Sequence, residues 1–498
     1  MQIGIIVEAA QVLLTPANVL LIIIGVCLGM VAGSIPGFTG TNTVAIALPF
    51  TLPMTAEIAL VFLSSLYVGA NYGGAIPAIL INTPGTSGAT ATVLDAYPMS
   101  QKGQAANALG ISLLASVIGG FLAAVALLVL LDPIGDIAFM FTNREIFVLA
   151  LFGLAAVAAT LGDNLRKGLI AGFLGLTIAM MPVDPTTGQR RLDFGFFALY
   201  DEVPFIPIVV GLFAISELFF LIKREAISQD TDIDISSYTE VIEGCKYVLS
   251  RPFQTLRAVV IGTLVGAMPG SGATLANFLS WAIAKTSSKT PDRFGKGNPD
   301  GVIASEASNN AVTAGALVPT LALGIPGSGT TAVMLAALLL HGVVPGPELM
   351  IDYELEAYVI MVSLLLANII LLVFAFWVSK YLVRVITLPA SLLVPSILVL
   401  TVVGTYAVRV QIFDIWLMIL FGVIGFVMRK NDYPLVPLLL GVILGPIAEG
   451  AFLRSMLISG DDPLVFLAGP ITKILWVLIL LVLFGRPLYN RASDRFLS

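Results

Sequence analysis

The sequence predicts an all-α polytopic membrane protein that consists of two homologous halves with broken or re-entrant helices. Hydrophobic residues make up 58% of its 498 residues and charged residues 11%, whereas soluble domains carry about 25% charged residues. The apolar residues lie in long continuous runs, which is typical of membrane helices and not of the alternating strands of a membrane β-barrel. Four Pro-Gly turns interrupt these runs in paired register, which indicates repeated, broken membrane segments.

The apolar runs predict how many segments meet the bilayer. The first long run begins near Ala17 and the last covers residues 464–484. At about 20 residues per span, the runs predict roughly 11–14 hydrophobic segments, and those too short to cross the bilayer are expected to form half-helices or hairpins. The longest polar stretch divides the chain into a first membrane repeat (1–225), a polar connecting segment (226–255) and a second membrane repeat (256–498).

Rare residue types exclude several classes of function. The two cysteines, Cys27 and Cys245, lie far apart, which excludes a disulfide framework and a thiolate metal cluster. The single histidine, His341, excludes zinc sites built on histidine pairs. No basic tract points to a nucleic-acid partner, and no G-x-x-x-x-G-K-[ST] motif points to ATP hydrolysis. We therefore expect no cofactor, and a coupling ion, Na⁺ or H⁺, as the source of energy.

The Pro-Gly turns form two pairs. A shift of 233 residues places the first turn on the third, and a shift of 242 residues places the second turn on the fourth. Proline ends a helix and glycine adopts backbone that a helix forbids, so each turn predicts a broken helix. Each is followed by small and hydroxyl residues. The turns contain Pro36-Gly37, Pro84-Gly85, Pro269-Gly270 and Pro326-Gly327.

Broken helices in repeated halves favour a secondary transporter with its site at the turns. Unpaired backbone cannot face lipid, so the turns are expected to line a cavity that protein encloses. The N–H groups at half-helix N-termini suit an anionic substrate, while carbonyl and hydroxyl oxygens suit a cation such as sodium. No turn contains lysine or arginine. The charge of a carboxylate must therefore be balanced by N–H dipoles, amides, hydroxyls or a co-bound cation.

The candidate site consists of the turns and the amides beside them. The ordinary alternative for a hydroxyl is a helix cap, and for an amide it is a hydrogen bond between helices. A sodium ion is expected near Thr43, Asn310 and Thr331. The candidate substrate-binding residues are Gly37, Thr39, Gly40, Thr41, Asn42, Asn82, Pro84, Gly85, Thr86, Ser87, Gly270, Ser271, Gly272, Thr274, Asn309, Asn310, Gly327, Ser328, Gly329 and Thr330.

Two carboxylates lie close to these segments, and a carboxylate inside the membrane is a functional candidate. Asp95 opens a polar stretch, and we expect it to be an interfacial structural residue paired with Lys102. Glu306 begins an apolar run and is either a functional carboxylate or a partner of the helix dipole. Proton coupling needs a titratable relay, whereas sodium needs only neutral oxygens. The scarcity of carboxylates deep in the apolar runs therefore favours sodium.

Three long motifs are specific enough to indicate a family. They are YGGAIPAILINTPG at 72–85, DAYPM at 95–99 followed by KGQA at 102–105, and EASNN at 306–310 leading to LGIPGS at 323–328. Together they resemble the large membrane subunit of the tripartite tricarboxylate transporters, over nearly the whole chain. The chain departs from the family pattern at Ala96, where glycine is expected, and at Ser308, where alanine is more usual. Neither change removes a functional group.

The resemblance implies a multi-pass permease of the bacterial inner membrane, embedded in the lipid bilayer. Its partners would be a small membrane subunit and a periplasmic solute-binding protein. The substrates implied are organic carboxylates, notably citrate and other di- or tricarboxylates. The resemblance also implies symport driven by an ion gradient, which agrees with the missing phosphate loop.

Other classes of function share parts of this sequence pattern. An ion antiporter or channel can also contain broken-helix repeats, and only the family motifs argue against it. An intramembrane protease would use Leu161-Gly162-Asp163 with Tyr200-Asp201, but the order of this aspartate pattern is reversed. A serine–histidine pair would need Ser328 and His341, which nothing orients. We therefore expect no enzyme.

Overall fold

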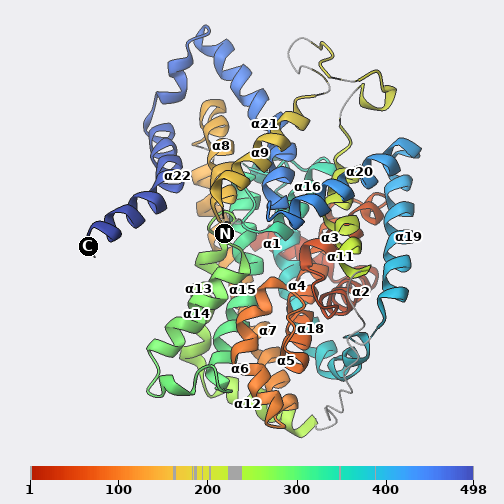
Figure 1. Ribbon diagram of the computed structural model, residues 1–498, viewed down its shortest axis with the longest axis vertical. Coiled ribbons are helices and arrows are strands. Elements are labelled where there is room, and N and C mark those ends of the chain that lie inside the picture. Colours follow the sequence, from red (N-terminus) through yellow and green to blue (C-terminus); the bar gives the residue numbers. More distant parts are fainter. Residues whose placement is uncertain are drawn as a thin grey trace. The chain divides into compact units, whose positions relative to one another are not determined.

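The chain is helical throughout the part that the structure describes. The computed structural model describes residues 3–138, 140–160, 164–181, 183, 188–192, 194–200, 203–222, 238–346, 349–386 and 388–496 (Figure 1). In these residues the β-type pairing is limited to an isolated bridge between Val183 and Arg190. The predicted all-α class is confirmed.

Eight helices among the described residues are long and apolar enough to cross a bilayer. Large apolar side chains on them face outward, since Leu20, Val373 and Val399 are each more than half exposed. Apolar surface of this extent suits contact with lipid, and the predicted polytopic membrane class is confirmed. The eight candidate spans are Pro16–Gly33, Ala56–Ile81, Ala105–Leu130, Phe205–Ile222, Glu354–Ser379, Ala390–Arg409, Ile412–Lys430 and Leu435–Ser459, and three shorter apolar helices are Gly4–Leu13, Gly329–Leu340 and Pro470–Phe484.

The helices sort into two compact units. The first comprises Met1–Pro133 and Glu217–Val408, and the second comprises Ile134–Ser216 and Arg409–Ser498. The second stretch of the first unit covers the end of the first predicted repeat, the connecting segment and part of the second repeat. The repeat boundaries at residues 225 and 256 stay a prediction.

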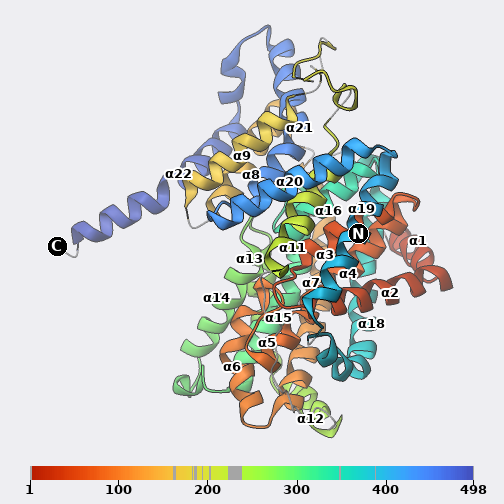
Figure 2. The same cartoon turned by 45° about the vertical axis from the view of Figure 1, so that its right-hand side comes forward.

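The first unit contains the segments around all four Pro-Gly turns. Its elements are α1 (Ile3–Leu13), α2 (Pro16–Gly33), α3 (Gly40–Ala47), η1 (Leu48–Thr51), α4 (Ala56–Gly73), α5 (Ala75–Ile81), η2 (Ser87–Ala89), α6 (Thr90–Gln101), α7 (Ala105–Ala138), α11 (Ser216–Ile222), α12 (Tyr238–Leu249), α13 (Pro252–Gly266), α14 (Gly272–Thr286), η5 (Pro291–Arg293), α15 (Pro299–Leu323), α16 (Gly329–Leu340), α17 (Leu349–Asp352), α18 (Glu354–Ile386) and α19 (Ala390–Arg409). Helices α2 and α4 lie side by side, and α13 and α14 lie beside α15 (Figure 1, Figure 2). The ends of α7 and α19 continue into the second unit.

The α2–α4 and α13–α15 pairs pack in an equivalent way. A Cβ atom added to Gly33 would lie 2.2 Å from the carbonyl oxygen of Ala70, and one added to Gly266 would lie 3.1 Å from the Cα of Val312. The shifts of 233 and 242 residues relate exactly these partners, Gly33 to Gly266 and Ala70 to Val312. A second equivalent set consists of Gly73 against Met30 and Gly315 against Thr263. The shifts that pair the turns in the sequence thus also pair these close helix contacts, which only small residues allow.

The second unit contains none of the candidate site residues. Its elements are α8 (Asn143–Thr160), α9 (Leu165–Ala179), η3 (Phe197–Leu199), α10 (Phe205–Val209), the π-helical η4 (Val210–Ile215), α20 (Ile412–Lys430), α21 (Leu435–Ser459), η6 (Pro463–Leu467) and α22 (Pro470–Phe496). Helices α9 and α21 touch backbone to backbone, because a Cβ added to Gly175 would lie 2.0 Å from the carbonyl oxygen of Leu438. Arg191 and Glu449 form an ion pair of 2.6 Å.

Part of the predicted connecting segment, 226–255, is a helix. Residues 223–237 lie outside the described residues, and α12 follows them. Helix α12 packs on α7, because a Cβ added to Gly110 would lie 2.1 Å from the carbonyl oxygen of Val241. The aspartates of the protease pattern, Asp163 and Asp201, also lie outside the described residues.

Candidate functional site

Each Pro-Gly turn separates two helix ends, as predicted. The first turn (34–39) joins α2 to α3, the second (82–86) joins α5 to η2, the third (267–271) joins α13 to α14, and the fourth (324–328) joins α15 to α16. Each turn includes a residue with left-handed backbone: Gly37 with φ 80°, Asn82 with φ 57°, Gly270 with φ 72° and Gly324 with φ 67°. Side chains disfavour this conformation, so glycine at three of the four positions has a local reason.

Hydroxyl side chains of the turns cap the helices that follow. Thr39 Oγ1 accepts a hydrogen bond of 3.3 Å from the N–H of Asn42 at the start of α3. Ser328 Oγ accepts from the N–H of Thr331 at 3.2 Å, and Thr331 Oγ1 accepts from the N–H of Ser328 at 2.9 Å. This reciprocal pair is a capping box at the start of α16. The capping role that the sequence left open is therefore present, and it is compatible with a further role in binding.

The four turns converge within the first unit. The third and fourth turns are joined by backbone, since Gly270 N–H donates to the carbonyl oxygen of Pro326 at 3.3 Å. The first and fourth turns are joined through α3 and α16, where the hydroxyls of Thr41 and Thr330 share a hydrogen bond of 3.2 Å. The second and third are joined where Thr274 Oγ1 donates to the carbonyl oxygen of Ser87 at 3.1 Å.

The turns approach one another so closely that a side chain has no room. A Cβ added to Gly85 would lie 2.0 Å from the carbonyl oxygen of Gly33, at the end of α2. The equivalent Cβ at Gly327 would lie 2.6 Å from the carbonyl oxygen of Gly266, at the end of α13. Glycine at these two positions therefore allows the second and fourth turns to pack against the helix ends that begin the first and third turns.

Buried amides connect the converging segments. Asn277 of α14 donates through Nδ2 to the carbonyl oxygen of Gly88 at 2.7 Å and to Oδ1 of Asn309 at 3.2 Å. Asn309 of α15 donates to the carbonyl oxygen of Asn71 in α4 at 3.4 Å. A network of amides thus ties α4, α14, α15 and the residues after the second turn together.

Several buried polar atoms of α4, α14, α15 and the second turn have no hydrogen-bond partner among the described residues. They are Asn71 Nδ2, Thr86 Oγ1, Asn277 Oδ1 and both side-chain atoms of Asn310. All four side chains are buried, and Asn277 and Asn310 have no exposed surface. Leaving a buried polar group unpaired costs about 1–3 kcal/mol, so each of these groups calls for a partner such as a ligand or water.

The positive electrostatic potential at the turns comes from helix dipoles and not from basic side chains. The N-termini of α3, α14 and α16 meet here, and a helix N-terminus presents open N–H groups with a partial positive charge. The four turns contain no lysine or arginine. Glu217 of α11 is an acidic group near this region, and the amide of Asn42 donates to its Oε2 at 3.4 Å. The arrangement can accept an anion through N–H, amide and hydroxyl donors.

Some predicted residues lie apart from these contacts. Asn82 is exposed and is the C-cap residue of α5, where its left-handed backbone ends the helix. Gly37 and the side chain of Ser87 are also exposed. Thr43 Oγ1 donates to the carbonyl oxygen of Thr39 at 3.1 Å, and Thr331 belongs to the capping box. A sodium ion near Thr43, Asn310 and Thr331 therefore stays a prediction.

Three residues of the convergence are not among the predicted site residues. Asn71 and Asn277 are the buried amides described above, and Tyr67 OH shares a hydrogen bond of 3.3 Å with Ser328 Oγ. The signal for Asn71 was available, because it directly precedes the first family motif inside an apolar run. Asn277 lies three residues after Thr274 on the same helix, which places both on one face.

The predicted partner of Asp95 was wrong. Its Oδ1 accepts from the N–H groups of Gly295 at 2.8 Å and Asn298 at 2.8 Å, and its Oδ2 accepts from Trp281 Nε1 at 2.7 Å. Lys102 Nζ donates instead to the carbonyl oxygen of Lys296. The two oxygens of a carboxylate can accept about four hydrogen bonds. Several backbone N–H groups satisfy this capacity better than the single ammonium group of Lys102 would. Asp95 thereby fastens the loop before α15 to α6.

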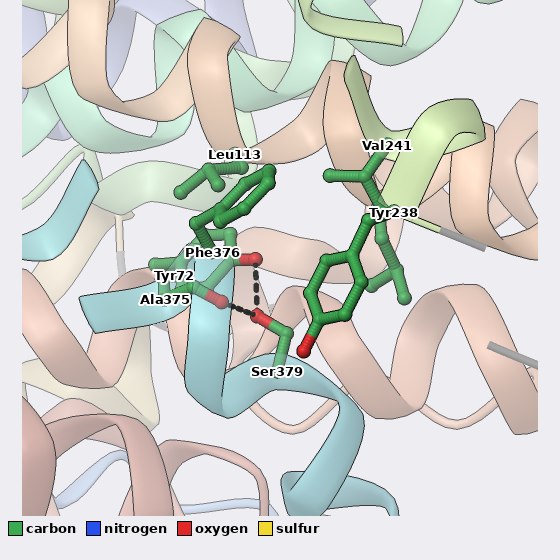
Figure 3. A pocket seen from close by; sticks show the side chains of 8 residues that line it. Tyr72, Leu113, Tyr238, Val241, Ala375, Phe376 and Ser379 are labelled. Carbon is green, nitrogen blue, oxygen red and sulfur yellow. Dashed lines mark hydrogen bonds between the residues drawn. The ribbon is translucent and has the colours of Figure 1, made fainter. Parts of the chain in front are cut away.

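A small pocket lies between α4 and three other helices of the first unit. It is formed by α4, α7, α12 and α18, and none of the candidate residues lines it. Tyr72 OH and Ser379 Oγ share a hydrogen bond of 3.0 Å there, and Ser379 Oγ donates to the carbonyl oxygen of Ala375 (Figure 3). The lining residues are Tyr72, Leu109, Leu113, Tyr238, Val241, Ala375, Phe376 and Ser379.

Eight helices of the described residues are long and apolar enough to span a bilayer, which defines a multi-pass membrane protein, and the buried convergence of broken helix ends is typical of transporters. The family model described as "Tripartite tricarboxylate transporter TctA family" matches residues 19–440. The chain belongs to this family, whose members are the large subunits of tripartite tricarboxylate transporters, and the resemblance drawn from the motifs is confirmed.

Two relatives from Agrobacterium vitis are similar to this chain. An "uncharacterized 52.8 kDa protein in TAR-I ttuC' 3'region" is 33% identical over 458 residues, which cover 92% of this chain and 91% of the relative. An "uncharacterized protein in TAR-II ttuC' 3'region" is 34% identical over 210 residues, which cover 42% of this chain and 87% of the relative. No solved structure matches the chain.

Proposed function

We propose that this chain is the permease subunit of a binding-protein-dependent secondary transporter that imports organic carboxylates, such as citrate or another di- or tricarboxylate, with a sodium gradient. The observation that carries the proposal is the convergence of four broken helix ends around buried amides with unpaired polar atoms. Membership of the tricarboxylate transporter family supports the substrate class.

The chemistry of the site fits a carboxylate. Carboxylate oxygens accept hydrogen bonds only, and the site provides the N–H groups of three helix N-termini and the amide donor of Asn71. Hydroxyls of Thr41, Thr274 and Thr330 add donors that can turn toward a ligand. A substrate with several carboxyl and hydroxyl groups would engage donors from more than one turn at once.

Family membership also supports the proposed partners and location. A small membrane subunit and a periplasmic solute-binding protein would complete a three-part system in the bacterial inner membrane. Because the turns hold no cationic side chain, we propose that part of the selectivity for the carboxylate comes from the binding protein.

The test is uptake of labelled citrate into proteoliposomes that contain the chain and its small partner. The binding protein is added, and a sodium gradient and then a proton gradient are imposed. We expect uptake that requires the binding protein and follows sodium. Uptake that follows protons alone would overturn sodium coupling, and uptake without the binding protein would overturn the tripartite arrangement.

A matched pair of variants ties uptake to the site. Asn277→Ala removes an amide that bridges Gly88 and Asn309, whereas Asn431→Ala removes an exposed amide in the second unit that bonds within its own helix end. We expect loss of uptake in the first and normal uptake in the second. If the wild type takes up none of citrate, succinate, malate and benzoate, the proposal of a carboxylate substrate is contradicted.

A further inference from the structure

Glu306 is a fully buried carboxylate outside the contacts of the four turns. It is the eighth residue of α15, too far along the helix to interact with the N-terminal dipole, which acts within the first turn. Thr92 of α6 donates to its Oε1, while Ser112 and Ser116 of α7 donate to its Oε2 at 3.1 and 2.8 Å. All three hydroxyl side chains are completely buried.

No lysine or arginine forms an ion pair with Glu306 in the part of the chain that the structure describes. Helix α7 carries no titratable residue between 105 and 131. On the other packed helices, Tyr72 of α4 interacts electrostatically with Glu306. Asp95, which follows Thr92 by three residues on α6, is engaged instead by the loop before α15 and by Trp281. An ionised carboxylate without a counter-ion costs several kcal/mol in the interior, even where hydroxyl groups donate to it. Its charge therefore requires a cation from outside.

The groups around Glu306 suit a monovalent cation. The two carboxylate oxygens and the hydroxyls of Thr92, Ser112 and Ser116 are all oxygen ligands, and Ser305 Oγ lies 3.1 Å from Thr92 Oγ1. Carboxylate and hydroxyl oxygens are the ligands that hard cations prefer. A protonated carboxyl would also fit, because it can donate to Thr92 Oγ1 while the hydroxyl of Thr92 donates to Ser305 Oγ. We propose that Glu306 and these hydroxyls bind the coupling cation, Na⁺ or a proton, in place of the neutral oxygens of Thr43, Asn310 and Thr331.

The position of Glu306 explains how a cation there would act on the substrate site. Gly88 packs against Asn309, since an added Cβ would lie 2.2 Å from Asn309 Oδ1. One helical turn away, Thr92 of the same segment meets Glu306 of the same helix. Separation of η2–α6 from α15 would break both contacts together. Substrate and cation therefore favour the same closed arrangement, and each raises the affinity for the other.

The proposal rests on ion-driven import, so its test separates transport from coupling. Glu306→Gln keeps the size of the side chain but removes its charge, and Glu57→Gln, near the start of α4, is the matched control. In proteoliposomes we expect Glu306→Gln to exchange labelled for unlabelled citrate across the membrane, with a raised KM because no cation increases the affinity, but not to accumulate it under a sodium or proton gradient. Glu57→Gln is expected to do both.

Binding of radioactive Na⁺ to the purified protein, at several pH values, distinguishes the two cations. If Na⁺ is the cation, binding falls at least about tenfold in Glu306→Gln, which corresponds to about 1.4 kcal/mol. If the proton is the cation, Na⁺ binding is unchanged and the pH dependence of citrate exchange disappears in Glu306→Gln. Thr92→Val and Ser116→Ala, which keep the carboxylate, are expected to weaken the same cation dependence.

Accumulation by Glu306→Gln with the sodium and pH dependence of the wild type would overturn this inference and leave the proposed function standing. A wild type that neither exchanges nor accumulates any carboxylate would overturn the proposed function and this inference with it. If Glu306→Gln does not fold, Thr92→Val and Ser116→Ala carry the test, and unchanged cation dependence in both would overturn the inference.

Discussion

Replacing Gly85 with alanine adds one methyl group where two backbones meet. The added Cβ would lie 2.0 Å from the carbonyl oxygen of Gly33 and 2.8 Å from the Cα of Gly74, whereas ordinary contact begins at 3.4 Å. Both neighbours are backbone atoms, so no rotation of a side chain relieves the clash, and the second turn must move away from the end of α2. Overpacking of this kind costs about 1–3 kcal/mol.

The shift of the second turn is expected to reach the substrate site, because Ser87 and Gly88 lie beside Gly85 and contact Thr274 and Asn277. At tenfold for each 1.4 kcal/mol, we expect the KM for citrate uptake to rise by roughly 5-fold to 150-fold. The assay is initial uptake in proteoliposomes, with membrane insertion and the size-exclusion profile as measures of folding. Gly4→Ala is the matched control, because no atom lies within 4 Å of its added Cβ. Wild-type uptake by Gly85→Ala would refute the assignment of a functional role to the packed turn.

Three further predictions use other contacts. Asn310→Leu removes two buried polar atoms without partners, so the free energy of unfolding should rise by about 1–3 kcal/mol. Uptake should nevertheless be lost. A variant that is more stable and still takes up citrate normally would contradict a binding role for Asn310. Asp95→Asn weakens hydrogen bonds to the loop before α15, so Tm should fall while the cation dependence of uptake stays unchanged, and the opposite pattern would count against its structural role. Thr41→Val removes the hydrogen bond to Thr330. Loss of about 1 kcal/mol of interaction free energy should raise the KM for citrate about fivefold. Thr55→Val is the control and should behave as the wild type, because the side chain of Thr55 caps no helix.

The sequence predicts the broken helices because their causes are local. Proline, glycine and a following hydroxyl residue determine where a helix ends and the next begins, and the capping by Thr39 and Ser328 follows from these residues alone. The paired register of the turns also reflects packing, since the same shifts relate the glycine contacts of Gly33 and Gly266.

The sequence does not predict which side chains face the convergence, because that depends on contacts between distant segments. Asn82 lies in the strongest family motif but ends a helix at the surface. Asn277 lies in an ordinary stretch of α14 and yet joins Gly88 to Asn309. The environment of Glu306 likewise arises from α6 and α7, which no spacing within its own motif reveals.

The most direct test of the account is whether a carboxylate occupies the convergence of the turns. Single cysteines are placed at Thr41→Cys and Thr274→Cys, with Gly4→Cys as control, after Cys27 and Cys245 are replaced by alanine. The rate of thiol modification is measured with and without the carboxylate that the reconstituted system takes up. We predict slower modification at both site positions and no change at the control. Unchanged rates at both site positions would contradict a substrate site formed by the four turns.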